Sequence, residues 1–239
     1  MSRSRSSWPA LLSKGVAYAL GALVLGVVAL QLWFFGHIVY WKSFNPSSTA
    51  FMQRRLDTLR AKDPRAQLRR QWVPYEAISI HLKRAVVVAE DARFLEHDGF
   101  DWQAIQEAMT KNENRGKVVA GASTISQQLA KNLFLSGERS WLRKAEEAAI
   151  TWMMEHTLSK RRILELYLNV AEWGDGVFGA EAAARYHFGV PASQLAPEQA
   201  AWLAAILPSP RTYKRGGITA YSLTRAQVIF ERMPGANIP

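Results

Sequence analysis

The chain has 239 residues, enough for one sizeable folded domain and an appended segment. Hydrophobic residues make up 49% of it, which excludes wholesale disorder. The 30 lysines and arginines against 20 acidic residues give a formal net charge of +10, which favours anionic partners, and the absence of cysteine excludes a disulfide framework.

Near the N-terminus, residues 15–36 carry no charge and are mostly apolar. At ~1.5 Å per residue, a helix of this length spans about 33 Å, enough to cross a bilayer core. Arg3, Arg5 and Lys14 precede the stretch and aromatic residues follow it, which favours a cytoplasmic N-terminus and an external remainder. A cleaved signal peptide is the alternative, but the stretch exceeds the usual apolar region of one and no small-residue cleavage site follows.

The next segment is mixed in composition and includes a basic amphipathic stretch, 51–70, that Pro64 interrupts. It is predicted to be a membrane-proximal connector or helix. From Ile78 onward, apolar residues recur at three- and four-residue spacing, which predicts a mainly α-helical domain. The expected organisation is an N-terminal cytoplasmic segment (1–14), a transmembrane helix (15–37), the connector (38–75) and the main domain (76–239).

Helix boundaries in this domain carry recognisable signals. Asp101 can cap a helix that ends before a polar loop at 112–121. Thr124 and Gln127 have the spacing of a capping box for a helix that reaches about Phe134.

Further along the chain, Ser159 can cap a helix, and Pro197 suits the first turn of another that Pro208 and Pro210 terminate. The apolar stripe of the first of these helices is Ile163, Leu164, Tyr167, Leu168 and Ala171. A tight turn with no strand before it is expected at Gly174, Gly176 and Gly179. The tryptophans predicted to pack in the core are Trp102, Trp152, Trp173 and Trp202.

A first candidate motif, E-D-A-R-F-L-E-H-D-G, runs from Glu90 to Gly99. If it begins as a helix, Glu90, Phe94 and His97 share one face. The apolar run before Glu90 would partly desolvate its carboxylate, which raises the pKa of an acid and suits a general base. An ordinary pair of helix-end acids is the alternative explanation of Glu90 and Asp91.

A second motif, G-A-S-T-I-S-Q-Q-L-A-K-N, occupies 121–132. Helical spacing places Thr124, Gln128 and Lys131 on one face, and the helix start offers N–H donors that could hold a phosphate or sugar hydroxyls. A solvated polar face with a routine cap is the alternative.

A third motif, R-K-A-E-E, covers 143–147 and places cations beside Glu146 and Glu147. Arg143 and Glu147 are four residues apart, so a surface ion pair worth ~0.3–0.5 kcal/mol would explain them without a function. No His, Asp or Glu residue has the sequence spacing of a zinc or calcium site.

With K-R-R-I-L-E-L-Y-L-N at 160–169, these motifs make the chain resemble the monofunctional biosynthetic peptidoglycan transglycosylases, relatives of the glycosyltransferase domain of class A penicillin-binding proteins. The match runs from about Ala85 to Tyr213. It implies a lysozyme-like helical glycosyltransferase domain with a smaller membrane-proximal jaw lobe. The implied activity is polymerisation of lipid II into β-1,4-linked glycan strands, with inversion at the donor anomeric carbon and release of undecaprenyl diphosphate.

The resemblance also implies residue roles. The family's general base falls on Glu90, and its second glutamate, which acts on the leaving diphosphate directly or through a divalent ion such as Mg²⁺ or Mn²⁺, falls on Glu147. The implied substrate-binding residues are Asp91, Phe94, Ser123, Thr124, Gln128, Lys131, Asn132, Arg139, Arg143 and Lys144. The chain departs from the family at Tyr186 and His187, where many relatives have the reverse order, and at Ser209, where relatives often have Asn.

The implied partners are lipid II, the growing glycan strand, the bacterial membrane and other cell wall synthases or divisome proteins, with no nucleic acid. The implied location is the bacterial cytoplasmic membrane, with a single span, a cytoplasmic N-terminus and a periplasmic catalytic domain. Two alternatives stay open. One is a lytic enzyme on a lysozyme-like scaffold, for which a lone glutamate suffices. The other is a non-catalytic module that binds lipid II or anionic lipid through its basic face.

Overall fold

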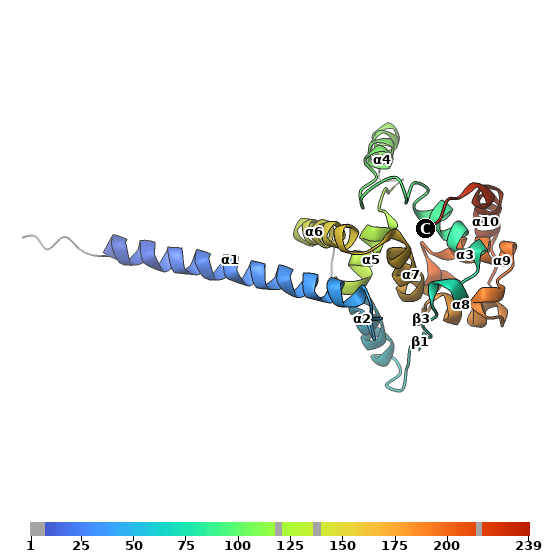
Figure 1. Cartoon of the computed structure of the whole chain (residues 1–239), viewed down its shortest axis with the longest axis horizontal. Helices are drawn as coiled ribbons and strands as arrows, with labels where there is room; N and C mark the ends of the chain where they lie inside the picture. Colours follow the sequence, from blue (N-terminus) through green and yellow to red (C-terminus); the bar gives the residue numbers. More distant parts are fainter. Residues whose placement is uncertain (1–7, 118–120, 136–139, 214–216) are drawn as a thin grey trace, which may run out of the picture.

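The computed structural model describes residues 8–117, 121–135, 140–213 and 217–239. A long N-terminal helix leads into a cluster of shorter helices that holds one small sheet (Figure 1). The helices are α1 (Trp8–Trp41), α2 (Ala50–Arg60), α3 (Ile80–Glu90), α4 (Trp102–Arg115), α5 (Ile125–Phe134), α6 (Trp141–Thr157), α7 (Lys160–Val170), α8 (Ala180–Phe188), α9 (Pro197–Ile206) and α10 (Ala220–Arg232). The strands are β1 (Arg69–Arg70), β2 (Glu172–Gly174) and β3 (Val177–Phe178).

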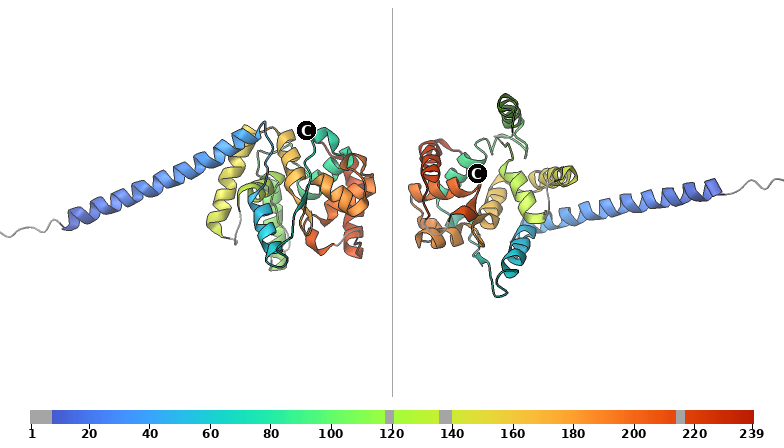
Figure 2. Two further views of the ribbon diagram at one scale, coloured as in Figure 1. Left: turned by 90° about the horizontal axis from the view of Figure 1, so that it is seen from below. Right: turned by 180° about the vertical axis from the view of Figure 1, so that it is seen from behind.

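The predicted apolar span is part of α1, and its stretch Gly15–Trp41 is long and apolar enough to cross a membrane. Most of this stretch stands away from the domain, as Figure 2 shows from two further sides. Only its last turns pack on the domain, where the rings of Phe34 and Trp41 each lie 5.0 Å from the ring of Phe134 on α5. The helix is therefore attached to the domain at one end only.

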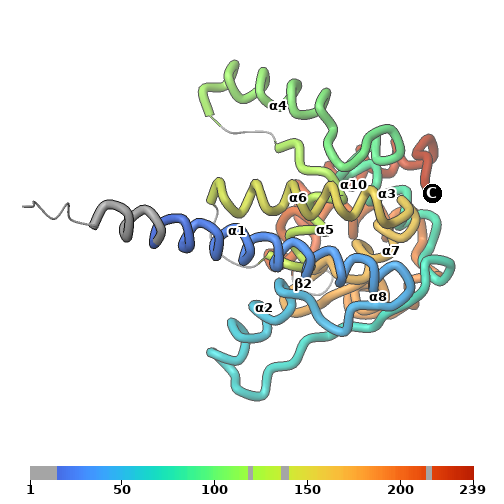
Figure 3. Tube along the Cα trace, turned by 60° about the vertical axis from the view of Figure 1, so that its left-hand side comes forward, coloured from blue at the N-terminus to red at the C-terminus, as the bar shows by residue number. Residues whose placement is uncertain are grey.

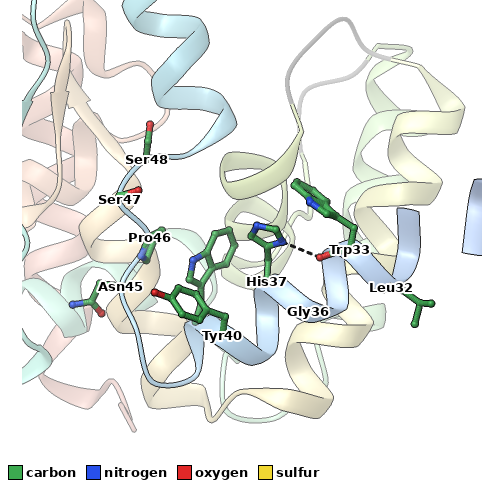
Figure 4. A pocket seen from close by; sticks show the side chains of 10 residues that line it. Leu32, Trp33, Gly36, His37, Tyr40, Asn45, Pro46, Ser47 and Ser48 are labelled. Carbon is green, nitrogen blue, oxygen red and sulfur yellow. Dashed lines mark hydrogen bonds between the residues drawn. The ribbon is translucent and has the colours of Figure 1, made fainter. Parts of the chain in front are cut away.

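At this junction α1 and the segment 45–48 line a cavity of about 600 Å³ (Figure 4). Trp33, His37 and Tyr40 project into it from α1. Rings that combine an apolar body with a polar atom are typical of the membrane–water boundary. Arg162 of α7 donates hydrogen bonds to the carbonyls of Trp41 (2.9 Å) and Phe44 (2.7 Å), which fixes the turn that follows the span.

The segment predicted as a connector packs into the domain. Thr49 caps α2, Met52 is buried, and α2 lies against α5. β1 pairs in parallel with β3, and β2 completes the sheet in the order β1-β3-β2. The predicted glycine turn is present at Gly176, but the expectation that no strand precedes it is wrong, because β2 and β3 form a small hairpin around this turn. The backbone packs most closely at Gly179 of this segment (φ +87°), where a Cβ would lie 2.8 Å from the backbone oxygen of Asn169.

The core lies between α3, α5, α7, α9 and α10. Ser159 and Pro197 begin α7 and α9 as predicted, and every residue of the predicted α7 stripe is buried. The predicted loop at 112–121 is wrong at its start, because α4 continues to Arg115. The helix ends there because Gly116 adopts the left-handed conformation (φ +61°) that closes many helices, and polar composition alone did not mark this point.

The tryptophan prediction is half wrong. Trp173 and Trp202 are buried, but Trp102 and Trp152 are 71% and 56% exposed. The reason for Trp102 is that α4 stands apart from the other helices, as Figure 3 shows, and buries none of its residues. Its indole stacks on the ring of Phe100 instead (5.8 Å between ring centres).

Candidate active site

The first motif does not continue as a helix. α3 ends at Glu90, and Asp91 takes an extended conformation (φ −164°). The Asp91 carboxylate accepts hydrogen bonds from the Ile125 N–H (3.0 Å) and pairs with the His97 ring (2.8 Å), so the chain turns away from the helix axis. The predicted shared face of Glu90, Phe94 and His97 is therefore wrong, since His97 contacts Asp91 and Phe94 is fully buried.

The Glu90 carboxylate lies at the C-terminal end of α3, among groups from three other helices. Its Oε2 accepts a hydrogen bond from the Gln128 side chain (2.9 Å), whose Oε1 in turn accepts from the Tyr167 hydroxyl (3.0 Å). Its Oε1 lies 3.7 Å from the Arg225 guanidinium and has no hydrogen-bond donor among the described residues. One oxygen is thus held and the other is available to accept a proton.

Burial governs the acidity of this group. The side chain of Glu90 is 11% exposed, and desolvation raises its pKa above the ordinary value of a glutamate. The hydrogen bond from Gln128 and the positive charges of Arg225 and Lys131 oppose that rise. In its ionised form, a carboxylate with a raised pKa is a stronger base than a solvated one.

A cavity of about 450 Å³ opens beside Glu90. Its walls are the end of α3, the loop after it, the first turns of α4 and the segment 121–124. Polar side chains on these walls include Arg93, Glu107 and Ser123, which suits a ligand rich in hydroxyl groups.

The start of α5 is not an open anion site, contrary to the expectation from the second motif. Three of its first four N–H groups donate to protein acceptors: Thr124 to the Gln127 side chain (3.1 Å), Ile125 to Asp91 (3.0 Å) and Gln127 to the Thr124 hydroxyl (3.2 Å). The Thr124 hydroxyl also donates to the Gly99 carbonyl (2.7 Å). The predicted capping box is confirmed, and it uses the donors that a phosphate would need.

The other predicted residues of α5 divide by exposure. Lys131 is exposed and close enough to Glu90 for its charge to act on the carboxylate. Ser123, which precedes α5 in the chain, is exposed, whereas Asn132, within α5, is buried. The predicted contact Arg139 lies outside the described residues.

The third motif begins α6, and its second glutamate points into the protein. Glu147 is 4% exposed, and its carboxylate contacts Arg143 (3.4 Å) and the Lys144 ammonium. The four-residue ion pair expected from the sequence is present, but its carboxylate is not on the surface.

Glu147, Thr151 and Glu155 lie on successive turns of one face of α6. This face packs on the first motif and on α5: the Glu155 carboxylate accepts a hydrogen bond from Ser126, and a Cβ at Gly99 (φ +90°) would lie 2.7 Å from Thr151. α5 therefore contacts both groups, since Gln128 bonds to Glu90 and Ser126 bonds to Glu155 of the α6 face.

One group among the described residues has metal-ligand geometry: Asp91, His97 and Asp101, whose ligand atoms lie within 4.8 Å of one another. It does not include Glu147, where the divalent ion was expected. Arg93 donates to both oxygens of Asp101 (3.0 and 2.5 Å), and both oxygens of Asp91 have protein partners. These carboxylates are satisfied by protein donors and a neighbouring cation, so they do not fit a bound metal ion.

Sequence reasoning missed two residues of the Glu90 environment. Tyr167 was assigned only to the apolar stripe of α7, yet its hydroxyl orients the Gln128 amide. Arg225 lies outside every motif and reaches the end of α3 from 136 positions away along the chain, so no local pattern marks it.

Fold and site together define a class: a helical enzyme domain carried on an N-terminal apolar helix, with a buried carboxylate beside a polar cavity. The family model described as Transglycosylase matches residues 56–234. A Biosynthetic peptidoglycan transglycosylase of Nitrosomonas eutropha is 52% identical over all of this chain and 98% of its own length. A protein of the same description from Nitrosospira multiformis is 58% identical over 89% of this chain and 93% of its own length. Another, from Aromatoleum aromaticum, is 59% identical over 84% of this chain and 88% of its own length. The chain belongs to the transglycosylase family.

Proposed function

We propose that this protein is a membrane-anchored peptidoglycan glycosyltransferase that polymerises lipid II into β-1,4-linked glycan strands and releases undecaprenyl diphosphate. Family membership supports the reaction class, since relatives named for peptidoglycan transglycosylation match almost the whole chain. The observation that carries the assignment of the site is the Glu90 carboxylate, which is buried at a polar cavity. Gln128 holds one of its oxygens, and the other has no donor in the part of the chain that the structure describes.

In the proposed reaction, Glu90 is the general base. Its Oε1 takes the proton of the acceptor sugar's 4-hydroxyl while that oxygen attacks the anomeric carbon of the donor. The bond from that carbon to the diphosphate breaks on the opposite side, so the configuration inverts. Because one carboxylate oxygen is already held by Gln128, the proton is received at a fixed position.

The leaving diphosphate gains negative charge as this bond breaks, and we assign its stabilisation to the cations around Glu147. Arg143 and Lys144 contact this buried carboxylate, which holds them in fixed positions at the start of α6. Fixed cations stabilise developing charge without reorganising during the reaction. Lys131 and Ser123 are assigned to the donor substrate, as is Arg139. Glu147 is also the residue that would bind a divalent ion, if one assists the departure.

The proposed location is the bacterial cytoplasmic membrane, with the N-terminus in the cytoplasm and residues 76–239 as the periplasmic catalytic domain. α1 supplies an apolar stretch long enough to cross the bilayer. α6 lies on the side of the domain from which that stretch extends (Figures 1 and 3), and it begins with the exposed Trp141 and Leu142. We assign this part of the domain to the smaller, membrane-proximal lobe. Other cell wall synthases and divisome proteins are the proposed protein partners.

Substitution of Glu90 by Gln tests this function in the purified full-length protein with lipid II. Loss of the base is expected to lower the polymerisation rate by about 10²–10⁴-fold, since the amide cannot accept the proton. Binding of lipid II is expected to change little, because the two side chains have nearly the same volume. Product strands separated on a gel measure the first quantity, and a binding assay with labelled lipid II measures the second.

Glu198→Gln is the matched control, because Glu198 is an exposed glutamate of α9 and no role is assigned to it. It should polymerise like the unsubstituted protein. Full turnover by Glu90→Gln would contradict the assignment of the base. Wild-type protein that shortens isolated peptidoglycan and makes no polymer from lipid II would instead support the lytic alternative.

A further inference from the structure

Arg225 of α10 contacts the end of α3 at two points. Its Nη2 lies 3.7 Å from Oε1 of Glu90 and 3.4 Å from the Ala89 carbonyl oxygen. The same guanidinium therefore contacts both the backbone of the last turn of α3 and the side chain of its last residue, Glu90. A cation at this position also interacts favourably with the negative end of the helix dipole.

The protein core fixes where Arg225 lies. The next residue, Ala226, is buried, as is Ile229 one turn later, and α10 packs on α9 and α3 through this face. The Arg225 side chain is 31% exposed, so its charge is only partly screened by solvent. A change in that side chain should therefore act on Glu90 rather than on the placement of α10.

Several charged or titratable groups face Glu90, and they act in different directions. Lys131 of α5 and Arg225 of α10 favour the ionised carboxylate, as does the hydrogen bond from Gln128. Asp91, the next residue, and burial favour the protonated acid. Tyr167 of α7 is buried with its pKa raised far above the ordinary value by desolvation, so it is uncharged.

The two cations are not equivalent. Lys131 is exposed, and the proposed function directs it to the donor substrate. Arg225 lies 3.7 Å from Oε1 of Glu90, and its second contact is the backbone carbonyl of Ala89. When substrate engages Lys131, Arg225 is the cation that continues to balance the carboxylate.

We propose that Arg225 is a positioning residue for the reaction: its charge, 3.7 Å from Oε1, keeps the Glu90 carboxylate ionised inside the protein. This inference rests on the proposed role of Glu90 as the base. In this proposal α10, which carries none of the motifs, influences the ionisation of the base.

Arg225→Gln tests the proposal through the pH profile of lipid II polymerisation. Removal of the positive charge makes the ionised carboxylate less stable, so the pKa of Glu90 rises and a higher pH is needed to form the base. The acid limb of kcat is expected to move up by about one pH unit, with kcat roughly 10-fold lower below neutral pH and partly recovered above pH 8. KM for lipid II should stay within about twofold, since the proposal assigns Arg225 to Glu90 and not to the substrate.

Arg225→Lys keeps the charge, so its acid limb is expected at the wild-type position, with a smaller loss of kcat from the altered geometry. Arg232→Gln removes a cation from the exposed last turn of the same helix and should leave the profile unchanged. Melting temperatures of all three variants show whether each is folded.

An acid limb that stays at the wild-type pH in Arg225→Gln would overturn the proposal. So would a loss of kcat that is equal at every pH and follows a lowered melting temperature, because that pattern indicates a purely structural role. A raised KM with unchanged kcat would also overturn it, as evidence of a substrate contact. These results differ from failure of the proposed function, which would appear as full activity of Glu90→Gln.

Discussion

Glu147 is a buried carboxylate that holds two cations on one turn of helix. A glutamine in its place would keep the volume but lose the charge that orders Arg143 and Lys144. If the ordered cations stabilise the departing diphosphate, Glu147→Gln should lower kcat by about 10²–10³-fold, the usual effect of removing one fixed electrostatic group. Initial rates of polymerisation at saturating lipid II measure this change.

The adjacent Glu146 offers the control. It lies on the same helix turn and has no ion pair among the described contacts, so Glu146→Gln should remain within about twofold of the wild-type rate. A drop of only twofold in Glu147→Gln would show that the ion pair supports the helix and not the reaction.

For single residues, the sequence predicted which residue types belong to the site but not where their side chains point. Glu90 was predicted as a partly desolvated acid, and its side chain is indeed buried with a raised pKa. Asp91 and Phe94 were assigned to substrate, but Asp91 is bonded to His97 and Ile125, and Phe94 lies in the core. A motif preserves which residues occur together, but the direction of each side chain depends on contacts made by distant elements.

Among the helices, α5 depends most clearly on its first turn. Thr124 closes that turn through its hydroxyl, which accepts from the Gln127 N–H and donates to the buried Gly99 carbonyl. Thr124→Ala removes both bonds and should lower the free energy of unfolding by about 1–3 kcal/mol. The expected drop in melting temperature of the detergent-solubilised protein is roughly 3–8 °C.

Thr124→Ser retains the hydroxyl and should keep most of that stability. An unchanged melting temperature in Thr124→Ala would show that the cap contributes little. Loss of activity in both variants without a change in melting temperature would instead indicate a direct contact of the threonine methyl group with substrate.

Helix starts were predicted well because capping is local. Asp101, Thr124 and Ser159 each accept a hydrogen bond from an N–H three residues later, a contact that spacing alone reveals. Helix ends were predicted less well. α3 ends at Glu90 because Asp91 bonds to α5, 34 positions away, and no local signal reports such a contact.

The whole molecule combines an apolar span with a domain that is attached to it at one end. The long apolar helix was predictable from composition, and the structure shows it as one continuous helix. The orientation of α6 relative to the span was not predictable, because it depends on how α6 packs on α1 and α5. In that packing α6, which begins with the exposed Trp141 and Leu142, lies on the side of the domain from which α1 extends (Figure 1).

These two side chains make the membrane placement testable. An exposed pair of large apolar residues next to a spanning helix is stabilised if lipid covers it. Because the chain has no cysteine, Trp141→Cys gives a single site for a polarity-sensitive fluorescent label. In the full-length protein reconstituted in vesicles, the label at 141 should emit at shorter wavelength than in water and be quenched by spin-labelled lipid.

Glu198→Cys on α9, on the side of the domain away from the span, is the control and should report an aqueous environment. Quenching at 141 but not at 198 would support a domain that approaches the bilayer through α6, close to the lipid-borne substrate. Confinement to the same membrane raises the effective concentration of that substrate around the enzyme. An equally aqueous label at both positions would contradict the assignment of α6 to the membrane-proximal lobe, since the anchor alone would then hold the domain at the surface.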